Sequence, residues 1–356
     1  MQSGVFESML YFVGLGIEQS LTVRSVNELR NCEIVYFESY TSPSVNDEMI
    51  SQVSGQMSPG KVEVVKREFV EDGRKILELS KRANVALLCS GDPMVATTHQ
   101  ELRTRAVKEG IATKVIHGSS ILCAVGGEFG LHSYNFGRVV TMTREPMQYT
   151  AYNTIFDNLL RGLHTTILLE WNETQKFFLE PASAIRSLED AERDLRQEIL
   201  DPSTLILIAS RLGSREMEIL ALTIEELKSK HLGPPPHVLV IPGRLHFTEL
   251  EALSALFGRN IESFPDNSKR ILRLSRRMVE KYTKKTLVAL AGAKKAAEVS
   301  SQKINFADIF ENVECYTRDS ERFLNEGKDE LAVLSIGYAE GLLDSLRFGG
   351  QLEFDW

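Results

Sequence analysis

The sequence predicts an α/β protein made of two α/β domains followed by a helical domain. Apolar strand-like runs alternate with amphipathic segments over residues 9–124, and a second alternation covers residues 133–262. From residue 268 onward helical apolar spacing dominates. Alternating strands and helices are typical of a mainly parallel sheet covered on both faces. The expected domains are residues 9–125, 126–267 and 268–356.

The first region shows strand patterns at residues 9–16, 33–41, 61–69, 84–91 and 113–121, and helix patterns at 22–32, 73–83 and 97–110. Thr98 precedes Glu101 by three residues, which is the spacing of a helix capping box, and Gly110 is a natural helix stop. The loop before this helix places Asp92 at the carboxyl end of a strand. Ligands bind at that edge of open α/β sheets.

The second region shows strand patterns at residues 137–143, 165–171, 203–213 and 236–243, and helix patterns at 152–163, 182–199, 223–232 and 247–258. Thr248 and Glu251 have the spacing of another capping box. We expect a second α/β domain with a mixed sheet. The boundary between the two domains lies near residues 126–137, which are rich in glycine and aromatic residues.

The third region combines segments of opposite charge. Residues 269–303 hold 11 Lys or Arg and two Glu, whereas residues 304–356 hold 4 Lys or Arg and 12 Asp or Glu. These charges predict a helical bundle in which a basic and an acidic helix pack side by side. The basic segment is also a candidate for binding RNA or an acidic partner, although such runs are more often solvated helix faces.

Composition excludes several classes of protein. The net charge of −8 argues against a general nucleic-acid binder. No apolar run approaches the roughly 20 residues that span a bilayer, and the N-terminus lacks an export signal. The four cysteines are scattered, so neither a disulfide framework nor a metal site is expected, and a reducing cytoplasm fits.

Two strand-end loops suggest ligand binding. The loop at residues 14–16, "GLG", fails the dinucleotide pattern because Gln19 stands where the third glycine belongs. It is therefore either a tight turn or a place where a ligand approaches the backbone. Asp92 either caps its turn or accepts hydrogen bonds from a ligand. As an anion it suits an ammonium or sulfonium group better than a phosphate.

Two further segments hold polar residues beside strands. In "HGSSI", residues 117–121, the serines either cap a helix or hydrogen-bond a ligand, and His117 is expected to be structural. His237 follows three prolines and precedes a strand. Neither a Ser-His-Asp order nor a zinc motif stands out. The catalytic base is thus unknown from the sequence, and only Tyr40 and Thr41 are candidates for the substrate side.

Taken together, the segments resemble the diphthine synthase family of the tetrapyrrole methylase superfamily. The resemblance covers residues 9–262 and rests on "YFVGLG", "FESYTS", "SGDPMVATTH", "IHGSSI", "GLHSYNFG", "RGLHTTILLEW" and "PPPHVLVIPGRLH", in that order. It implies two α/β domains with S-adenosylmethionine in the cleft between them, and a homodimer. It also implies methylation of the modified histidine of translation elongation factor 2 during diphthamide synthesis.

The resemblance also implies a set of cofactor contacts. Carried over position by position, they are Ile17, Asp92, Val95, Ser120, Ile121, Leu169, Leu212 and His237. Leu212 is bulkier than the residue common at its position, and residues 125–130 and 201–210 contain insertions relative to the family.

Two other functions remain open from the sequence. One is a corrin or porphyrin methylase of the same fold, and the other is an RNA- or ribosome-associated adaptor that uses the basic segment. The C-terminal "YAEGLLDSL", residues 338–346, resembles a small archaeal helical domain of unknown function.

Overall fold

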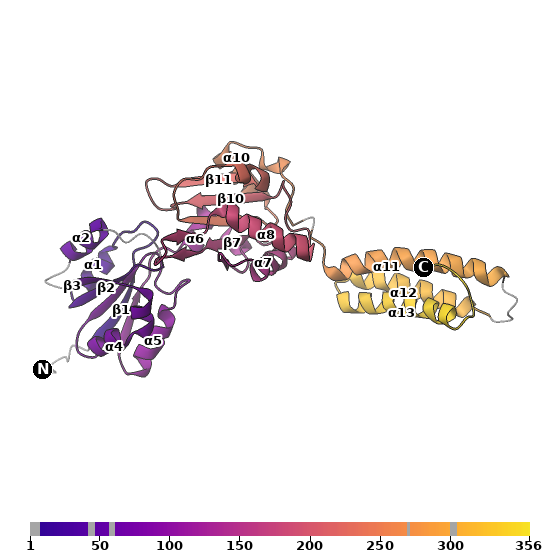
Figure 1. Ribbon diagram of the computed structural model, residues 1–356, viewed down its shortest axis with the longest axis horizontal. Helices are drawn as coiled ribbons and strands as arrows, with labels where there is room; N and C mark the ends of the chain where they lie inside the picture. Colours follow the sequence, from indigo (N-terminus) through magenta and orange to yellow (C-terminus); the bar gives the residue numbers. More distant parts are fainter. Residues whose placement is uncertain (1–7, 42–46, 57–60, 269–270, 300–304) are drawn as a thin grey trace. The chain divides into compact units, whose positions relative to one another are not determined.

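The computed structural model describes residues 8–41, 47–56, 61–268, 271–299 and 305–356. The chain divides into two compact units, residues 1–271 and 272–356 (Figure 1). The described part of the first unit holds two five-stranded sheets with their helices, and that of the second unit holds three helices. This arrangement confirms the predicted fold class. The finer boundary at residues 125 and 126 stays a prediction.

The first sheet is wholly parallel, with the strand order β3-β2-β4-β1-β5. Its strands are β1 (Met9–Gly14), β2 (Ile34–Glu38), β3 (Lys61–Val65), β4 (Val85–Cys89) and β5 (Ala112–Ile116). Parallel strands covered on both faces read as continuous apolar runs. The central strand β4 illustrates this, since all five of its residues are apolar and buried.

Helices cover both faces of the first sheet (Figure 1). They are α1 (Val23–Leu29), α2 (Asp47–Gln56), α3 (Arg67–Asp72), α4 (Arg74–Ser80) and α5 (His99–Lys108). Side chains alternate across a strand, so Leu10 and Phe12 pack with α4 and α5, while Tyr11 and Val13 pack with α1 and α2. The sequence did not predict α2, whose composition is mainly polar.

The second sheet is mixed, as expected, with the order β11-β10-β12-β7-β6. Only the pairing of β6 with β7 is parallel among its described strands. The strands are β6 (Val140–Met142), β7 (Thr165–Leu169), β10 (Leu205–Ser210), β11 (Glu218–Thr223) and β12 (His237–Ile241). Neither β11 nor the short hairpin of β8 (Trp171–Asn172) and β9 (Phe177–Phe178) was predicted.

Two helix layers sandwich the second sheet. One face is covered by α7 (Tyr149–Leu160), α8 (Pro181–Leu195) and α9 (Ile224–Ser229), the other by α6 (Ile121–Glu128) and α10 (Phe247–Phe257). Short 3-10 turns, η1 (Ser133–Asn135) and η2 (Ile261–Ser263), follow α6 and α10. Because Val125 of α6 packs with strands of the second sheet, the chain passes from one core to the other directly after β5.

Both predicted capping boxes are wrong. Thr98 is the N-cap of α5, but its side chain makes no capping bond and lies 3.3 Å from the hydroxyl of Tyr40. The helix α10 begins after His246, two residues before Thr248. There Glu249 accepts a hydrogen bond from the His246 amide at 2.8 Å. The helix α10 therefore has a capping box formed by His246 and Glu249, two residues earlier than predicted, whereas at α5 the Thr98 hydroxyl lies near Tyr40 instead of the helix amides.

The second unit is a bundle of α11 (Leu274–Val299), α12 (Ala307–Asn325) and α13 (Asp329–Phe348). The basic α11 packs against both acidic helices, as predicted. Lys294 bonds to Glu314 across α11 and α12 at 2.6 Å, and Arg273 bonds to Asp329 at 3.0 Å. Among the described helices, none combines the length and apolarity that crossing a membrane requires.

Glycines allow three strand-end loops of the first sheet to touch backbone to backbone. Gly16, with a φ of +72°, exchanges two hydrogen bonds of 3.0 Å with Gly91. A Cβ atom on Gly118 would meet the Gly91 carbonyl oxygen and the Gly16 nitrogen more closely than real Cβ atoms approach backbone. The ends of β1, β4 and β5 therefore form one compact edge.

Gly118→Ala tests this edge. The new methyl group has only backbone to displace, so we expect a loss of about 1–3 kcal/mol in the free energy of unfolding, the range for overpacking. Gly127→Ala is the matched control, since a Cβ there meets nothing within 4 Å in the helix α6. That change should be neutral or stabilise by up to about 1 kcal/mol. Equal stability of the two variants in denaturant unfolding would contradict the close approach.

Candidate functional site

The first unit contains a cavity of about 1400 Å³ at the carboxyl ends of β1, β2, β4 and β5. Residues from β7, β10 and β12 of the second sheet line it as well. Pockets for a single small ligand typically occupy about 300–1,000 Å³. The cavity therefore has room for a cofactor-sized molecule together with part of a second substrate.

All eight predicted contact positions line this one cavity. They are Ile17, Asp92, Val95, Ser120, Ile121, Leu169, Leu212 and His237. The candidate substrate-side residues Tyr40 and Thr41 line it too. Segments more than 200 residues apart in the chain thus meet at one cavity. The sequence predicted this convergence only through the family resemblance. Their part in binding a cofactor remains a prediction.

Asp92 uses both carboxylate oxygens in its own loop. Oδ1 accepts a hydrogen bond from the Met94 amide at 2.8 Å, which caps the turn. Oδ2 lies 2.7 Å from Nδ1 of His117, whose side chain is otherwise exposed. His117 therefore has the structural role expected for it, as the partner of Asp92. Asp92 caps its turn and also borders the cavity, so the two interpretations from the sequence are compatible.

The two serines of "HGSSI" differ in what they do. Ser120 is the N-cap of α6, and its hydroxyl accepts a hydrogen bond from the Leu122 amide at 3.2 Å. Ser119, for which the sequence left a cap or a ligand contact open, accepts a hydrogen bond from the Ile17 amide at 3.0 Å and donates one to Glu18 at 2.6 Å. Ser119 thereby ties the loop after β1 to the loop after β5.

His237 offers one free ring nitrogen to the cavity. Its Nδ1 lies 2.8 Å from the hydroxyl of Ser210, while its buried Nε2 has no hydrogen-bond partner in the described chain. Burial, followed by the nearby guanidinium of Arg211, lowers the pKa of His237. The ring is therefore neutral near pH 7 and is suited to one hydrogen bond with a ligand.

Other buried polar atoms along the cavity wall also lack partners among the described residues. They are His99 Nε2 and Trp171 Nε1. Buried polar atoms are normally paired, so these atoms fit a ligand that offers donors and acceptors along its length. A nucleoside joined to an amino acid meets this requirement, and the residues present therefore fit S-adenosylmethionine.

His99 is a residue that the sequence did not single out. Its Nδ1 donates to the carbonyl of Pro93 at 3.0 Å, which leaves Nε2 as an acceptor. Burial lowers the pKa of His99 to about 4, although the hydrogen bond to Pro93 opposes the shift. The side chain thus lies in the cavity wall as a neutral ring whose Nε2 has no hydrogen-bond partner among the described residues.

The end of β2 carries a buried acid that the sequence also missed. Glu38 is 1% exposed and accepts hydrogen bonds of 3.0 Å from the amides of Tyr40 and Thr41, and another from the Thr41 hydroxyl. Burial raises the pKa of Glu38 to about 6, against the effect of these bonds. Glu38 is the second residue of the quoted "FESYTS", which was the available signal.

Other charged residues of the wall are Glu170 and Glu173, near β7 and the β8–β9 hairpin, and Arg211, Arg215 and Glu216, which follow β10. Ser39 donates to Glu173 at 2.5 Å, and Glu170 accepts from the guanidinium of Arg144 at 2.9 Å. The lining also includes Arg67 and Glu68. No group of three or more His, Cys, Asp or Glu suited to a metal ion occurs within the described ranges.

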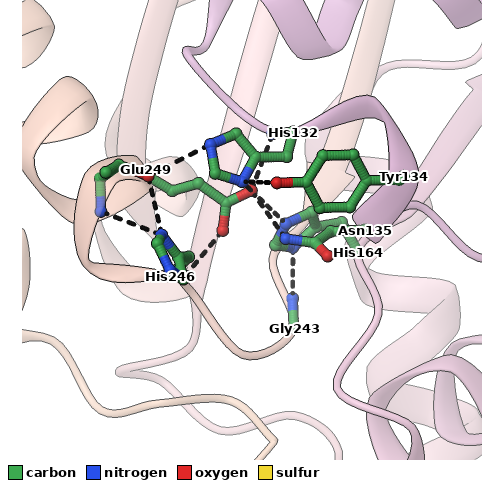
Figure 2. Close-up of polar contacts among 8 residues, drawn as sticks. His132, Tyr134, Asn135, His164, Gly243, His246 and Glu249 are labelled. Atoms are coloured by element: carbon green, nitrogen blue, oxygen red, sulfur yellow. Dashed lines mark hydrogen bonds and ion pairs between the residues drawn. The ribbon is translucent and has the colours of Figure 1, made fainter.

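Three quoted segments meet at a second polar cluster, none of whose residues lines the cavity (Figure 2). At its centre the buried carboxylate of Glu249 accepts hydrogen bonds from the His132 amide at 2.7 Å and from Asn135 Nδ2 at 3.1 Å. The ring of His164 lies 3.2 Å away, and Gly243 bonds to that ring from behind at 2.9 Å. The cluster joins "GLHSYNFG", "RGLH" and "IPGRLH" and has a structural role.

Comparisons with known proteins agree with the fold. Residues 9–228 match the family described as tetrapyrrole (corrin/porphyrin) methylases. A diphthine synthase of Methanosarcina barkeri is 37% identical over 262 residues, covering 70% of this chain and 96% of the relative. One from Sulfurisphaera tokodaii is 34% identical over 256 residues, covering 69% and 98%. A crystal structure of diphthine synthase matches with a TM-score of 0.62 and 32% identity, over 74% of this chain and 100% of the other.

Fold and cavity therefore define a methyltransferase of the tetrapyrrole methylase family, to which the chain belongs. Within that family it belongs to the diphthine synthases, since it covers nearly their whole length. Residues 281–352 match a protein family of unknown function (DUF357), which confirms the resemblance of the C-terminal region.

Glu249→Gln tests whether the second cluster contributes to stability and not to ligand binding in the cavity. An amide would set a donor against the N–H groups that now point at the carboxylate, and hydrogen bonds to charged groups contribute about 1.5–3 kcal/mol each. We expect a loss of about 2–4 kcal/mol in the free energy of unfolding, with cofactor affinity unchanged once folded. Glu251→Gln, on the exposed side of α10, is the control and should change little. Unfolding curves that coincide for both variants would refute the structural role.

Proposed function

We propose that this chain transfers methyl groups from S-adenosylmethionine to the aminocarboxypropyl-modified histidine of translation elongation factor 2, during diphthamide synthesis. The observation that carries the proposal is the convergence of all eight predicted contact positions on one cavity. When bound, S-adenosylmethionine supplies a methyl group on a positively charged sulfonium. The chain's contribution is then to align the acceptor and exclude water.

The residues that would hold the cofactor fall into two kinds. The glycine edge of β1, β4 and β5 offers backbone without intervening side chains, beside the carboxylate of Asp92. Across the cavity, Leu169 and Leu212 provide apolar contacts, and His237 Nε2 provides a hydrogen bond. An acid near a sulfonium lowers the energy of the bound cation, whereas a phosphate would be repelled.

The rest of the cavity suits an acceptor that carries both an amine and a carboxylate. Trp171 Nε1–H and the guanidinium of Arg67 are donors for a carboxylate. Glu173 and Glu68 are acceptors for an ammonium group. An aminocarboxypropyl side chain has both groups, which supports it over a macrocyclic tetrapyrrole.

Two further features belong to the same proposal. We infer a homodimer from the resemblance to the family, and a cytoplasmic location from the nature of the substrate, a translation factor. Size-exclusion chromatography with light scattering would test the dimer, because a monomer mass across the concentration range would contradict it.

The decisive experiment is methyl transfer by the purified full chain. Labelled S-adenosylmethionine and elongation factor 2 carrying the aminocarboxypropyl histidine should give label on that histidine. Elongation factor 2 with unmodified histidine is the control and should remain unlabelled. Failure to label the modified histidine, together with labelling of an added tetrapyrrole, would replace this proposal by the corrin or porphyrin methylase alternative.

Asp92→Ala should weaken S-adenosylmethionine binding by about 1–3 kcal/mol, the range for removing a hydrogen-bonding partner of a charged group. Since Asp92 also caps its turn, Asp92→Asn is needed beside it, because an amide retains a carbonyl acceptor for Met94. His117→Ala is the second control, since it removes only the outer partner. Titration calorimetry measures the affinity of the wild type and the three variants. Equal affinities for all four proteins would show that Asp92 only caps its turn and does not contribute to cofactor binding.

A further inference from the structure

A buried carboxylate lies behind the cavity wall with a single hydroxyl group leading to it. Glu38 is absent from the cavity lining, whereas Thr41 belongs to it. The Thr41 hydroxyl donates its hydrogen to Glu38 Oε1, so its oxygen lone pairs remain able to accept a hydrogen bond. Thr41 therefore connects the cavity with Glu38.

The titratable groups next to Glu38 do not compete with its carboxylate as a base at neutral pH. Tyr40 belongs to the same loop as Glu38, and Cys89 faces Glu38 from β4. Glu173 faces it from the turn between β8 and β9. The Arg67 guanidinium stacks on the Tyr40 ring, 5.1 Å from its centre. Burial raises the pKa of the Tyr40 phenol and that of the Cys89 thiol, so both stay protonated at neutral pH. Burial, with the charge of Glu173 as a lesser cause, raises the pKa of Glu38 to about 6.

We propose that Thr41 and Glu38 form a proton relay that deprotonates the amine of the acceptor side chain before each methyl transfer. The inference rests on the proposed function. The ammonium passes a proton to Thr41 Oγ1 while the Thr41 proton moves to Glu38 Oε1, which leaves a neutral amine and a neutral carboxylic acid. The amine lone pair then forms the new N–C bond as the S–C bond breaks, and that bonding pair stays on sulfur. Glu38 returns its proton to solvent after product release.

The relay would supply a neutral amine, which is the form that accepts a methyl group and is scarce in water at pH 7. A primary ammonium in water titrates near pH 10, so only about a thousandth of it is neutral at pH 7. Entry into a half-buried cavity lowers the ammonium pKa by desolvation, which moves it toward that of Glu38. A raised carboxyl pKa and a lowered ammonium pKa favour proton transfer between the two, and positioned bases of this kind contribute about 10²–10⁴-fold.

Thr41→Val and Thr41→Ser test the relay through the pH dependence of methyl transfer. The wild-type rate should reach a plateau above about pH 6, where Glu38 is ionised. Thr41→Val keeps both amide bonds to Glu38 but lacks the hydroxyl, so its rate should fall at least about 100-fold at pH 7 and then rise with pH as solvent deprotonates the amine. Thr41→Ser, which restores the hydroxyl, should restore the plateau.

Glu38→Gln supplies a readout that does not depend on turnover. Difference infrared spectroscopy of the free full chain should show a protonated carboxyl signal with a midpoint near pH 6 that Glu38→Gln removes. Glu28→Gln, whose carboxylate bonds to Lys114 outside the cavity, is the matched control and should leave both the signal and the rate profile unchanged.

The outcomes separate this inference from the proposed function. Coincident pH profiles for the wild type and Thr41→Val, or a wild type without the infrared signal near pH 6, overturn the relay while methyl transfer stands. A wild type that transfers no methyl group overturns the proposed function and the relay with it. Loss of the plateau in Thr41→Val with recovery in Thr41→Ser supports the relay.

Discussion

The close approach of three strand ends is the constraint on which the rest of the structure depends. Gly14, Gly16 and Gly118 let the loops after β1 and β5 reach the loop at Gly91 with backbone against backbone. Side chains at Gly14 and Gly118 would push the loops apart, because the nearest atoms there belong to the main chain, and Gly16 has a φ of +72° that side chains disfavour. The edge of the parallel sheet is thereby compact, and Gly91 brings it to the cavity between residues that carry side chains.

The chemical character of the cavity comes from the side chains that line it. The second sheet contributes Leu169, Leu212 and the neutral ring of His237, while β2 contributes the corner of Glu38, Tyr40 and Thr41. Apolar contacts and single hydrogen bonds suit a cofactor that must be held in one orientation. In the proposed reaction, Glu38 and Thr41 accept the proton that the acceptor amine must lose.

Much of the fold was predictable because apolar periodicity reports burial directly, as in the continuous run of β4. The edge strand β11 escaped notice because it pairs on one side only and runs straight into α9. Thr98 had the spacing of a cap, yet its hydroxyl lies near Tyr40, 58 residues away in sequence. The cavity positions were available from a family resemblance, but the role of Glu38 depends on burial and distances that no local pattern encodes.

The cluster at Glu249 has a consequence for judging histidines by their motifs. His164 accepts a hydrogen bond at Nδ1 from the Gly243 amide, so its one ring proton sits on Nε2 and points at Glu249 (Figure 2). The imidazole is fixed in a single tautomer with both nitrogens occupied. It cannot take up a proton at Nδ1 without breaking the bond from the Gly243 amide. His164, although it lies in a segment quoted for the family resemblance, is thus held in a structural role, and the proposed proton relay depends instead on the buried acid Glu38.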